Sequence, residues 1–141
     1  MDTQEKVFNI PGKLDVTWRE DGKAIVDTWS SYFISLEDFS SAVLIKGLNY
    51  AKERGGVAWI VDSRKAIGAF SKEIQQYIND VIFPAFTNNG IKYFITITSD
   101  IYLTKKTVDA YAANVEHNGL RLIEMGSVEE AVNWLKENEL K

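Results

Sequence analysis

The chain has 141 residues, enough for one domain that buries roughly two-thirds of the surface exposed in its unfolded state. Hydrophobic residues make up 45% and charged residues 26% of the sequence, which is ordinary for a soluble globular protein. The net charge of −4 provides no general attraction to nucleic acids or anionic membranes. The absence of cysteine excludes disulfides, thiol catalysis and thiolate metal sites.

Targeting and cofactor signals are also missing from the sequence. No apolar run approaches the roughly 20 residues that a membrane-spanning helix requires. Residues 1–14 lack the apolar core of a signal peptide, so we expect a cytoplasmic protein without a membrane span. Neither G-x-x-x-x-G-K-[ST] nor G-x-G-x-x-G occurs, and we therefore expect no nucleotide cofactor, nor any other cofactor.

A β-hairpin is predicted over residues 14–29. Residues 14–20 alternate between apolar and polar side chains, and Asp21-Gly22 is a dipeptide favoured in the two-residue type I′ turn. Such a turn pairs Trp18 with Ile25 and places Trp29 on the same face of the sheet. We expect the hairpin to form one side of the sheet, preceded by an extended N-terminal segment at 1–13.

The remaining elements are expected to alternate between helices and strands. Helices are predicted from Ser35 to the Gly55-Gly56 stop, over about 72–88, near 104–117, and after Ser127, which forms an S-x-x-E capping box with Glu130. Strands are predicted at 57–61, 92–98 and 120–125. The order β-β-α-β-α-β-α-β-α predicts a single α/β domain over 1–141 with a mixed, mainly parallel, five-stranded sheet.

Two titratable residues, Asp27 and His117, could have either a structural or a functional role. Asp27 shares a face with Trp18 and Trp29, where a carboxylate is costly unless it has a partner. We interpret it as a strand-end residue satisfied by backbone amides or a lysine, with a functional acid as the alternative. His117 lies in the last turn of the 104–117 helix, and without a second histidine or a cysteine it indicates a surface role and no metal site.

A ligand site is predicted beyond the carboxyl ends of the strands, where ligands bind in parallel α/β sheets. Arg64 and Lys65, near the start of the next helix, would suit a small anion. Solvated loop residues are the alternative interpretation. The residues gathered at these strand ends are Trp29, Asp62, Arg64, Lys65, Ser99 and Tyr102.

Phe83 departs from the apolar pattern of the 72–88 helix. It lies nine positions past Ile74, and at about 100° per residue it points away from the buried stripe. Pro84 follows inside the helix, where proline removes a backbone donor and usually causes a kink. Either the kink turns Phe83 inward, or Phe83 is exposed and contributes to a homodimer interface, the outcome we predict.

The order of elements resembles the STAS domain, the fold of anti-sigma-factor antagonists. The stretches "SVEEAVNWLKE" and "FPAFTNNGIKYFITIT" look like a bacterial branch of STAS-like proteins that is sometimes grouped with lipid-binding SEC14-type domains. The resemblance covers most of residues 14–138 and contains no catalytic signature. It implies a binding or regulatory domain rather than an enzyme.

Ser71 occupies the start of the helix that follows the 57–61 strand. In antagonist STAS domains a serine at this position is phosphorylated within an Asp-Ser motif. Here the helix opens with Phe70-Ser71-Lys72-Glu73, and the Asp-Ser pair of this chain, Asp62-Ser63, lies at the strand end instead. Ser71 is therefore either an N-cap, the interpretation we favour, or a phosphorylation switch.

These observations lead to three functional hypotheses. The first is a non-enzymatic STAS-like domain that acts through a protein partner or a small ligand. The second is a SEC14-like module that binds a lipid or another apolar small molecule. The third is a small enzyme using Asp27 or Asp62, for which the sequence supplies no convergent acid and base groups.

Overall fold

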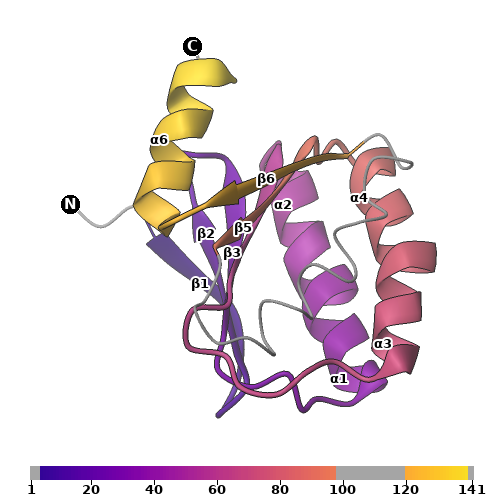
Figure 1. Ribbon diagram of the computed structural model, residues 1–141. Helices are drawn as coiled ribbons and strands as arrows, with labels where there is room; N and C mark the ends of the chain where they lie inside the picture. Colours follow the sequence, from indigo (N-terminus) through magenta and orange to yellow (C-terminus); the bar gives the residue numbers. More distant parts are fainter. Residues whose placement is uncertain (1–3, 98–119, 140–141) are drawn as a thin grey trace.

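The computed structural model describes residues 4–97 and 120–139, and it shows an α/β protein built on one mixed sheet (Figure 1). The predicted 104–117 helix, with His117, lies outside the described residues. The sheet has six strands: β1 (Gln4–Ile10), β2 (Leu14–Arg19), β3 (Ala24–Trp29), β4 (Ala58–Asp62), β5 (Tyr93–Ile97) and β6 (Arg121–Met125).

The strands lie side by side in the order in which they occur in the chain. β1, β2 and β3 are antiparallel neighbours, whereas β3, β4, β5 and β6 are parallel. The prediction of five strands was one too few, because Gln4–Ile10 pairs with β2 and does not form a free segment. β1 therefore takes the exposed edge position, and β2, which we expected at the edge, is buried.

The predicted hairpin register is confirmed, although its turn is not. Trp18 pairs with Ile25, and Leu14 pairs with Trp29. The last pair is Arg19 with Ala24, so four residues connect the strands instead of two. The positive φ angle occurs at Lys23, at 50°, and not at the Asp21-Gly22 dipeptide, so the turn is not type I′. A four-residue turn leaves the register unchanged, because it adds one residue to the loop from each strand.

Three helical segments are described. The first comprises α1 (Leu36–Ser40), the π-helical η1 (Ser41–Leu48) and α2 (Asn49–Glu53). The second comprises α3 (Lys72–Tyr77), the π-helical η2 (Ile78–Ile82) and α4 (Phe83–Asn88). The third is α6 (Val128–Asn138), and the serine caps predicted for all three are confirmed, with Ser35, Ser71 and Ser127 accepting from the amides of Asp38, Ile74 and Glu130.

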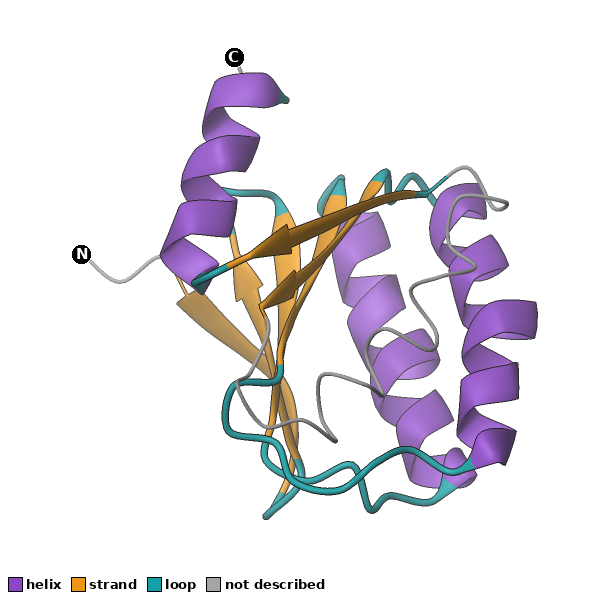
Figure 2. Cartoon of the chain, in the orientation of Figure 1, coloured by secondary structure: helices purple, strands orange, loops and turns teal. Residues whose placement is uncertain are grey.

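The sheet separates two hydrophobic layers. The first two helical segments lie together over one face, and α6 lies on the other (Figures 1 and 2). The larger layer contains most of the aromatic side chains, including Trp18, Trp29 and Trp59. The smaller layer is aliphatic where β3, β4 and β5 meet α6. β4 is buried along its whole length, as its apolar sequence predicted.

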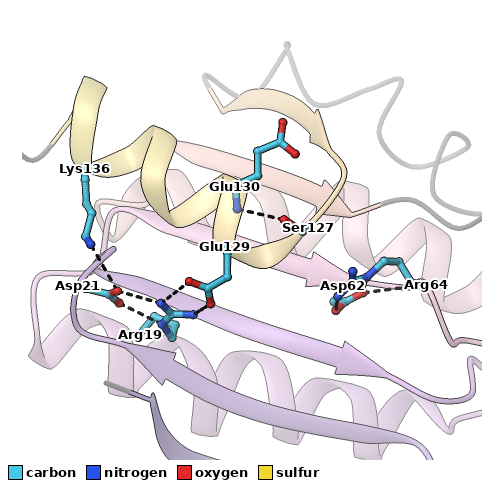
Figure 3. A network of polar contacts seen from close by, with 8 residues as sticks. All are labelled: Arg19, Asp21, Asp62, Arg64, Ser127, Glu129, Glu130 and Lys136. Atoms are coloured by element: carbon cyan, nitrogen blue, oxygen red, sulfur yellow. Dashed lines mark hydrogen bonds and ion pairs between the residues drawn. The ribbon is translucent and has the colours of Figure 1, made fainter. Parts of the chain in front are cut away.

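An ion-pair network connects α6 to the end of β2 (Figure 3). The guanidinium of Arg19 lies 2.8 Å from Asp21 and 2.5 Å from Glu129, which is in the first turn of α6. The two carboxylates raise the pKa of Arg19 above its usual range through hydrogen bonds, those from Asp21 acting most strongly. This network holds the N-terminal end of α6 against the sheet.

Candidate functional site

Asp27 is the most unusual side chain of the described core. It lies on the interior strand β3, between Val16 of β2 and Val61 of β4, and its exposed fraction is 2%. Its side chain shares the aromatic face of the sheet with Trp18 and Trp29, as the alternation of the strand predicted. The interpretation of Asp27 as a strand-end residue satisfied by backbone amides or a lysine was wrong.

One of the two carboxylate oxygens of Asp27 has a partner, and the other has none. The indole Nε1 of Trp59 donates to Oδ2 at 2.8 Å, while no described residue donates to Oδ1. Burial raises the pKa of Asp27 from 3.8 to about 7, and the hydrogen bond from Trp59 opposes that rise. A group that water would normally solvate is thus kept inside the core, and one of its two oxygens has no donor among the described residues.

Asp27 lines a small cavity between the sheet and the first two helical segments. The space open to the centre of a water molecule is about 20 Å³, and roughly 10–15 Å³ is enough for one water. Among the described residues of the lining, Asp27 is the one titratable side chain, and the others are apolar or aromatic: Trp29, Phe39, Val43, Trp59, Val61, Phe70, Ile78, Ile82, Phe83, Phe86 and Phe94. We call this space the Asp27 cavity.

The two π-helical segments form part of the cavity wall. η1 contributes Val43, and η2 contributes Ile78 and Ile82. π-helical turns are rare and occur frequently at functional sites, because they widen a helix locally and change the direction of its side chains. Both helices that cover the Asp27 cavity therefore depart from α-helical geometry where they line it.

Phe83 belongs to the cavity wall and not to the surface. Its exposed fraction is 0%, and its ring lies edge-to-face with Phe94 at 5.2 Å between centroids. The backbone N–H of Phe83 donates to the carbonyl of Ile78, five residues earlier. Each residue of this π-helical stretch therefore rotates the chain by less than the 100° that we assumed. The exposed alternative was wrong, and the dimer interface predicted at Phe83 loses its basis.

Pro84 accounts for the position of η2 in the second helical segment. Proline has no N–H to donate to the carbonyl of Asp80, and its ring clashes with that carbonyl in a regular α-helix. The π-helical turns immediately before Phe83 are one way to relieve this conflict. The sequence signal for the inward rotation of Phe83 was therefore its proline neighbour.

Four of the residues predicted at the carboxyl ends of the strands are described, and only one of them lines the Asp27 cavity. Trp29 lines the Asp27 cavity. Asp62 and Arg64 instead bind each other, with Nε and Nη2 of Arg64 at 3.0 and 2.8 Å from the two carboxylate oxygens (Figure 3). Lys65 is exposed in the loop that leads to α3, and Ser99 and Tyr102 lie outside the described residues. Because Arg64 already has an internal counter-ion, the support for an anion site is weakened.

Two loops, 30–35 and 63–71, follow the carboxyl ends of β3 and β4 and lead to the first two helical segments (Figure 2). They meet in a single parallel bridge between Ser31 and Ile67. Tyr32, in the first loop, is buried, and its hydroxyl lies near that of Ser63 without forming a hydrogen bond of normal geometry. Burial raises the pKa of Tyr32 above its usual range, so this hydroxyl remains protonated.

Ser71 is an N-cap, as the favoured interpretation predicted. Its Oγ accepts from the backbone N–H of Ile74 at 3.2 Å, and the side chain is exposed at the start of α3. Glu73 lies in the first turn of the helix, where the dipole favours a negative charge. This geometry explains the serine without phosphorylation.

Other site chemistries find little support in the described part of the chain. Residues 4–97 and 120–139 contain no group of three or more His, Cys, Asp or Glu side chains placed to hold a metal ion. In the same ranges, no helix combines the length and the apolar character needed to cross a membrane.

Comparison of the chain with models of protein families, with curated proteins and with solved structures found no match. The interpretation of the site therefore depends on its geometry alone.

Sequence reasoning singled out Asp27 and Trp29 but missed the other half of the site. Trp59 was visible only as part of an apolar strand, and Phe70 only as the residue before the cap Ser71. The apolar sequences of strands 23–29 and 57–61 predicted that both faces of each strand are buried. They did not predict the register between the two strands. Only that register brings the indole of Trp59 to the carboxylate of Asp27.

Proposed function

We propose that this protein is a non-enzymatic binding domain that holds a small, mainly apolar molecule in the Asp27 cavity. The observation that carries the proposal is the oxygen Oδ1 of Asp27, which has no partner among the described residues and lies in a cavity whose other described lining residues are apolar or aromatic. Ligand pockets typically combine an apolar wall with very few polar groups that orient the ligand. The Asp27 cavity has this composition.

A purely structural role does not explain Asp27. A buried, half-satisfied carboxylate destabilises a fold, and an apolar residue of similar size at this position would avoid the cost. Strongly perturbed carboxyl groups in apolar surroundings are typical of functional sites. The described lining offers no second titratable group, which favours binding over acid–base catalysis.

The cavity must enlarge to accept more than a water-sized molecule. In the described conformation it holds about 20 Å³ of such space. We expect this enlargement at the two π-helical segments, because both line the cavity and depart from α-helical geometry. A small aromatic molecule could then enter between the rings of the wall. Its contacts with these rings would take the place of the contacts that the rings now make with one another.

A titration with toluene tests this proposal. Amide shifts in nuclear magnetic resonance spectra should change for residues around the cavity, and native mass spectrometry of the freshly purified protein should show whether a small molecule is retained. Val43→Leu adds one methylene group inside the cavity and should weaken binding. Val81→Leu is the matched control, because Val81 lies on η2, is 38% exposed and does not line the cavity. Uniform or absent shifts would contradict the proposal.

A second candidate is a regulatory, STAS-like module that binds another protein. Two exposed apolar side chains favour it: Phe33 and Ile67, which are 61% and 55% exposed. They lie in the two loops that are joined by the Ser31–Ile67 bridge, and the second of these loops ends at Ser71, the N-cap of α3. Contiguous exposed apolar side chains are typical of interaction surfaces.

The regulatory hypothesis makes a distinct prediction about assembly. If Ser71 is a switch, Ser71→Asp should change the sedimentation behaviour of the protein, whereas Ser71→Ala should not. If Ser71 is only a cap, the two variants should sediment alike. Intact-mass analysis of protein isolated from its native cells would show directly whether Ser71 carries a phosphate.

A further inference from the structure

We propose that the ligand of the Asp27 cavity is an organic ammonium: a protonated amine on a small apolar body, with its N–H group donating to Oδ1 of Asp27. This inference rests on the function proposed above and specifies the class of ligand. It follows from the hydrogen-bonding state of Asp27, from the chemistry of the cavity wall, and from what the wall lacks.

The first argument is the unused acceptor. An ionised carboxylate only accepts hydrogen bonds, and Oδ2 already accepts from Trp59. A ligand that completes the site must therefore donate to Oδ1. A hydroxyl group could donate as well, but it would leave a buried negative charge without a counter-charge. An ammonium group supplies both the donor and the opposite charge, which is the arrangement in which buried charges are tolerated.

The second argument is the aromatic wall. Two tryptophans and five phenylalanines line the cavity. The face of an aromatic ring is electronegative and attracts cations, and tryptophan is the most effective of the aromatic residues. Aromatic cages are accordingly a common means of recognising organic ammonium groups. Trp29 and Trp59 both contribute to the wall, and the Nε1–H of Trp59 donates to Asp27, so the aromatic wall and the carboxylate belong to one site.

The third argument is the absence of positive charge. Among the described residues that line the cavity there is no lysine, arginine or histidine. An anionic ligand would therefore be repelled by the carboxylate of Asp27, and no described cation in the wall would offset that repulsion. Carboxylates and phosphates are therefore poor candidates for the cavity, and Arg64, in the loop after β4, is already paired with Asp62.

The experiment compares three ligands of the same size: benzylamine, benzyl alcohol and toluene. The titrations are carried out at pH 8. At this pH the amine is protonated, as a lysine side chain is, and the carboxyl group of Asp27 is mostly ionised, because its pKa is about 7. We expect benzylamine to bind about tenfold more tightly than benzyl alcohol. A hydrogen bond between charged groups is stronger than a neutral one by a free energy that corresponds to roughly this difference in affinity.

Two variants separate the carboxylate from the rest of the site. Asp27→Asn removes the negative charge and should lose the preference for benzylamine over benzyl alcohol. Trp59→Phe removes the donor to Oδ2 and replaces the indole with a ring that attracts cations less strongly, but it retains the carboxylate, so benzylamine should still bind more tightly than benzyl alcohol, by a smaller factor than in the wild type. Circular dichroism spectra of both variants establish that they are folded before titration.

The outcomes distinguish this inference from the proposal on which it rests. Equal binding of all three ligands would support an apolar binding site and overturn the ammonium proposal. Equal binding of benzylamine and benzyl alcohol, both tighter than toluene, would show that a donor is required but a charge is not, and would also overturn it. If none of the three ligands binds, both proposals fail.

Discussion

Replacing Asp27 with asparagine should change how the stability of the protein depends on pH. The wild-type carboxyl group has a pKa of about 7 in the folded protein and 3.8 as an unperturbed aspartate. Between these values the folded state binds more protons than the unfolded state, so the free energy of unfolding falls as the pH rises. Above the folded-state pKa the loss is complete. Asparagine cannot ionise, and the variant lacks this dependence.

The size of the effect follows from the shift in pKa. Each pH unit within the window removes about 1.4 kcal/mol from the free energy of unfolding. Between pH 5 and pH 8 the wild type should therefore lose about 3 kcal/mol relative to Asp27→Asn. The amide oxygen of asparagine can still accept from the indole of Trp59, so the variant keeps the hydrogen bond that the structure shows.

Urea denaturation at several pH values, monitored by tryptophan fluorescence, measures this difference. Asp80→Asn, a substitution of an exposed carboxylate on η2, controls for the loss of one negative charge. The free energies of wild type and Asp27→Asn should diverge steadily between pH 5 and pH 7. Parallel pH dependence of the two proteins would refute the conclusion that Asp27 is kept in an unfavourable environment.

Three further substitutions test the packing and the caps. Gly47→Ala should destabilise the protein by about 1–3 kcal/mol, since an added Cβ would lie 2.8 Å from the ring of Trp59. Ser71→Ala should cost about 1 kcal/mol, because it removes the N-cap of α3. Arg19→Met should cost about 1–3 kcal/mol and loosen α6, because the largely buried Asp21 and the exposed Glu129 both lose the guanidinium of Arg19. Urea denaturation measures all three.

Each of these substitutions has a matched control. Gly22→Ala brings the new Cβ no closer than 3.4 Å to its neighbours and should cost less than Gly47→Ala. Ser71→Asp preserves the cap and should remain near wild type. Lys136→Met removes a cation that lies 3.8 Å from Asp21 and is half-exposed, and should have little effect. If a control is as destabilising as its counterpart, the contact assigned to that residue is not the cause.

Local patterns in the sequence determined most of the secondary structure. The alternation of residues 14–20 and the short loop after them determined the hairpin register, and Trp18 accordingly pairs with Ile25. Ser35, Ser71 and Ser127 were recognisable as caps because capping depends only on residues within one turn. β1 was missed because it lies at the edge, where strand residues are exposed and the apolar alternation is weak.

The helix containing Phe83 shows where a local pattern fails. Its orientation was calculated from a constant rotation per residue, which holds for a regular α-helix. Pro84 and the π-helical η2 change that rotation, and whether the chain kinks outward or rotates inward depends on the packing around it. The contact of Phe83 with Phe94 on β5 shows that the sheet accommodates the inward form.

The site itself was determined in part by the sequence and in part only by the tertiary structure. The alternation of β3 was sufficient to place Asp27 on an apolar face with Trp29, because side-chain direction along a strand has a period of two. Its partner Trp59, and the rings that surround it, come from strands and helices that are distant in the chain. The register between parallel strands is set by packing across long crossovers rather than by a turn, so no local pattern encodes it. For that reason only the folded protein shows that the carboxylate of Asp27 faces an aromatic cavity with one oxygen free.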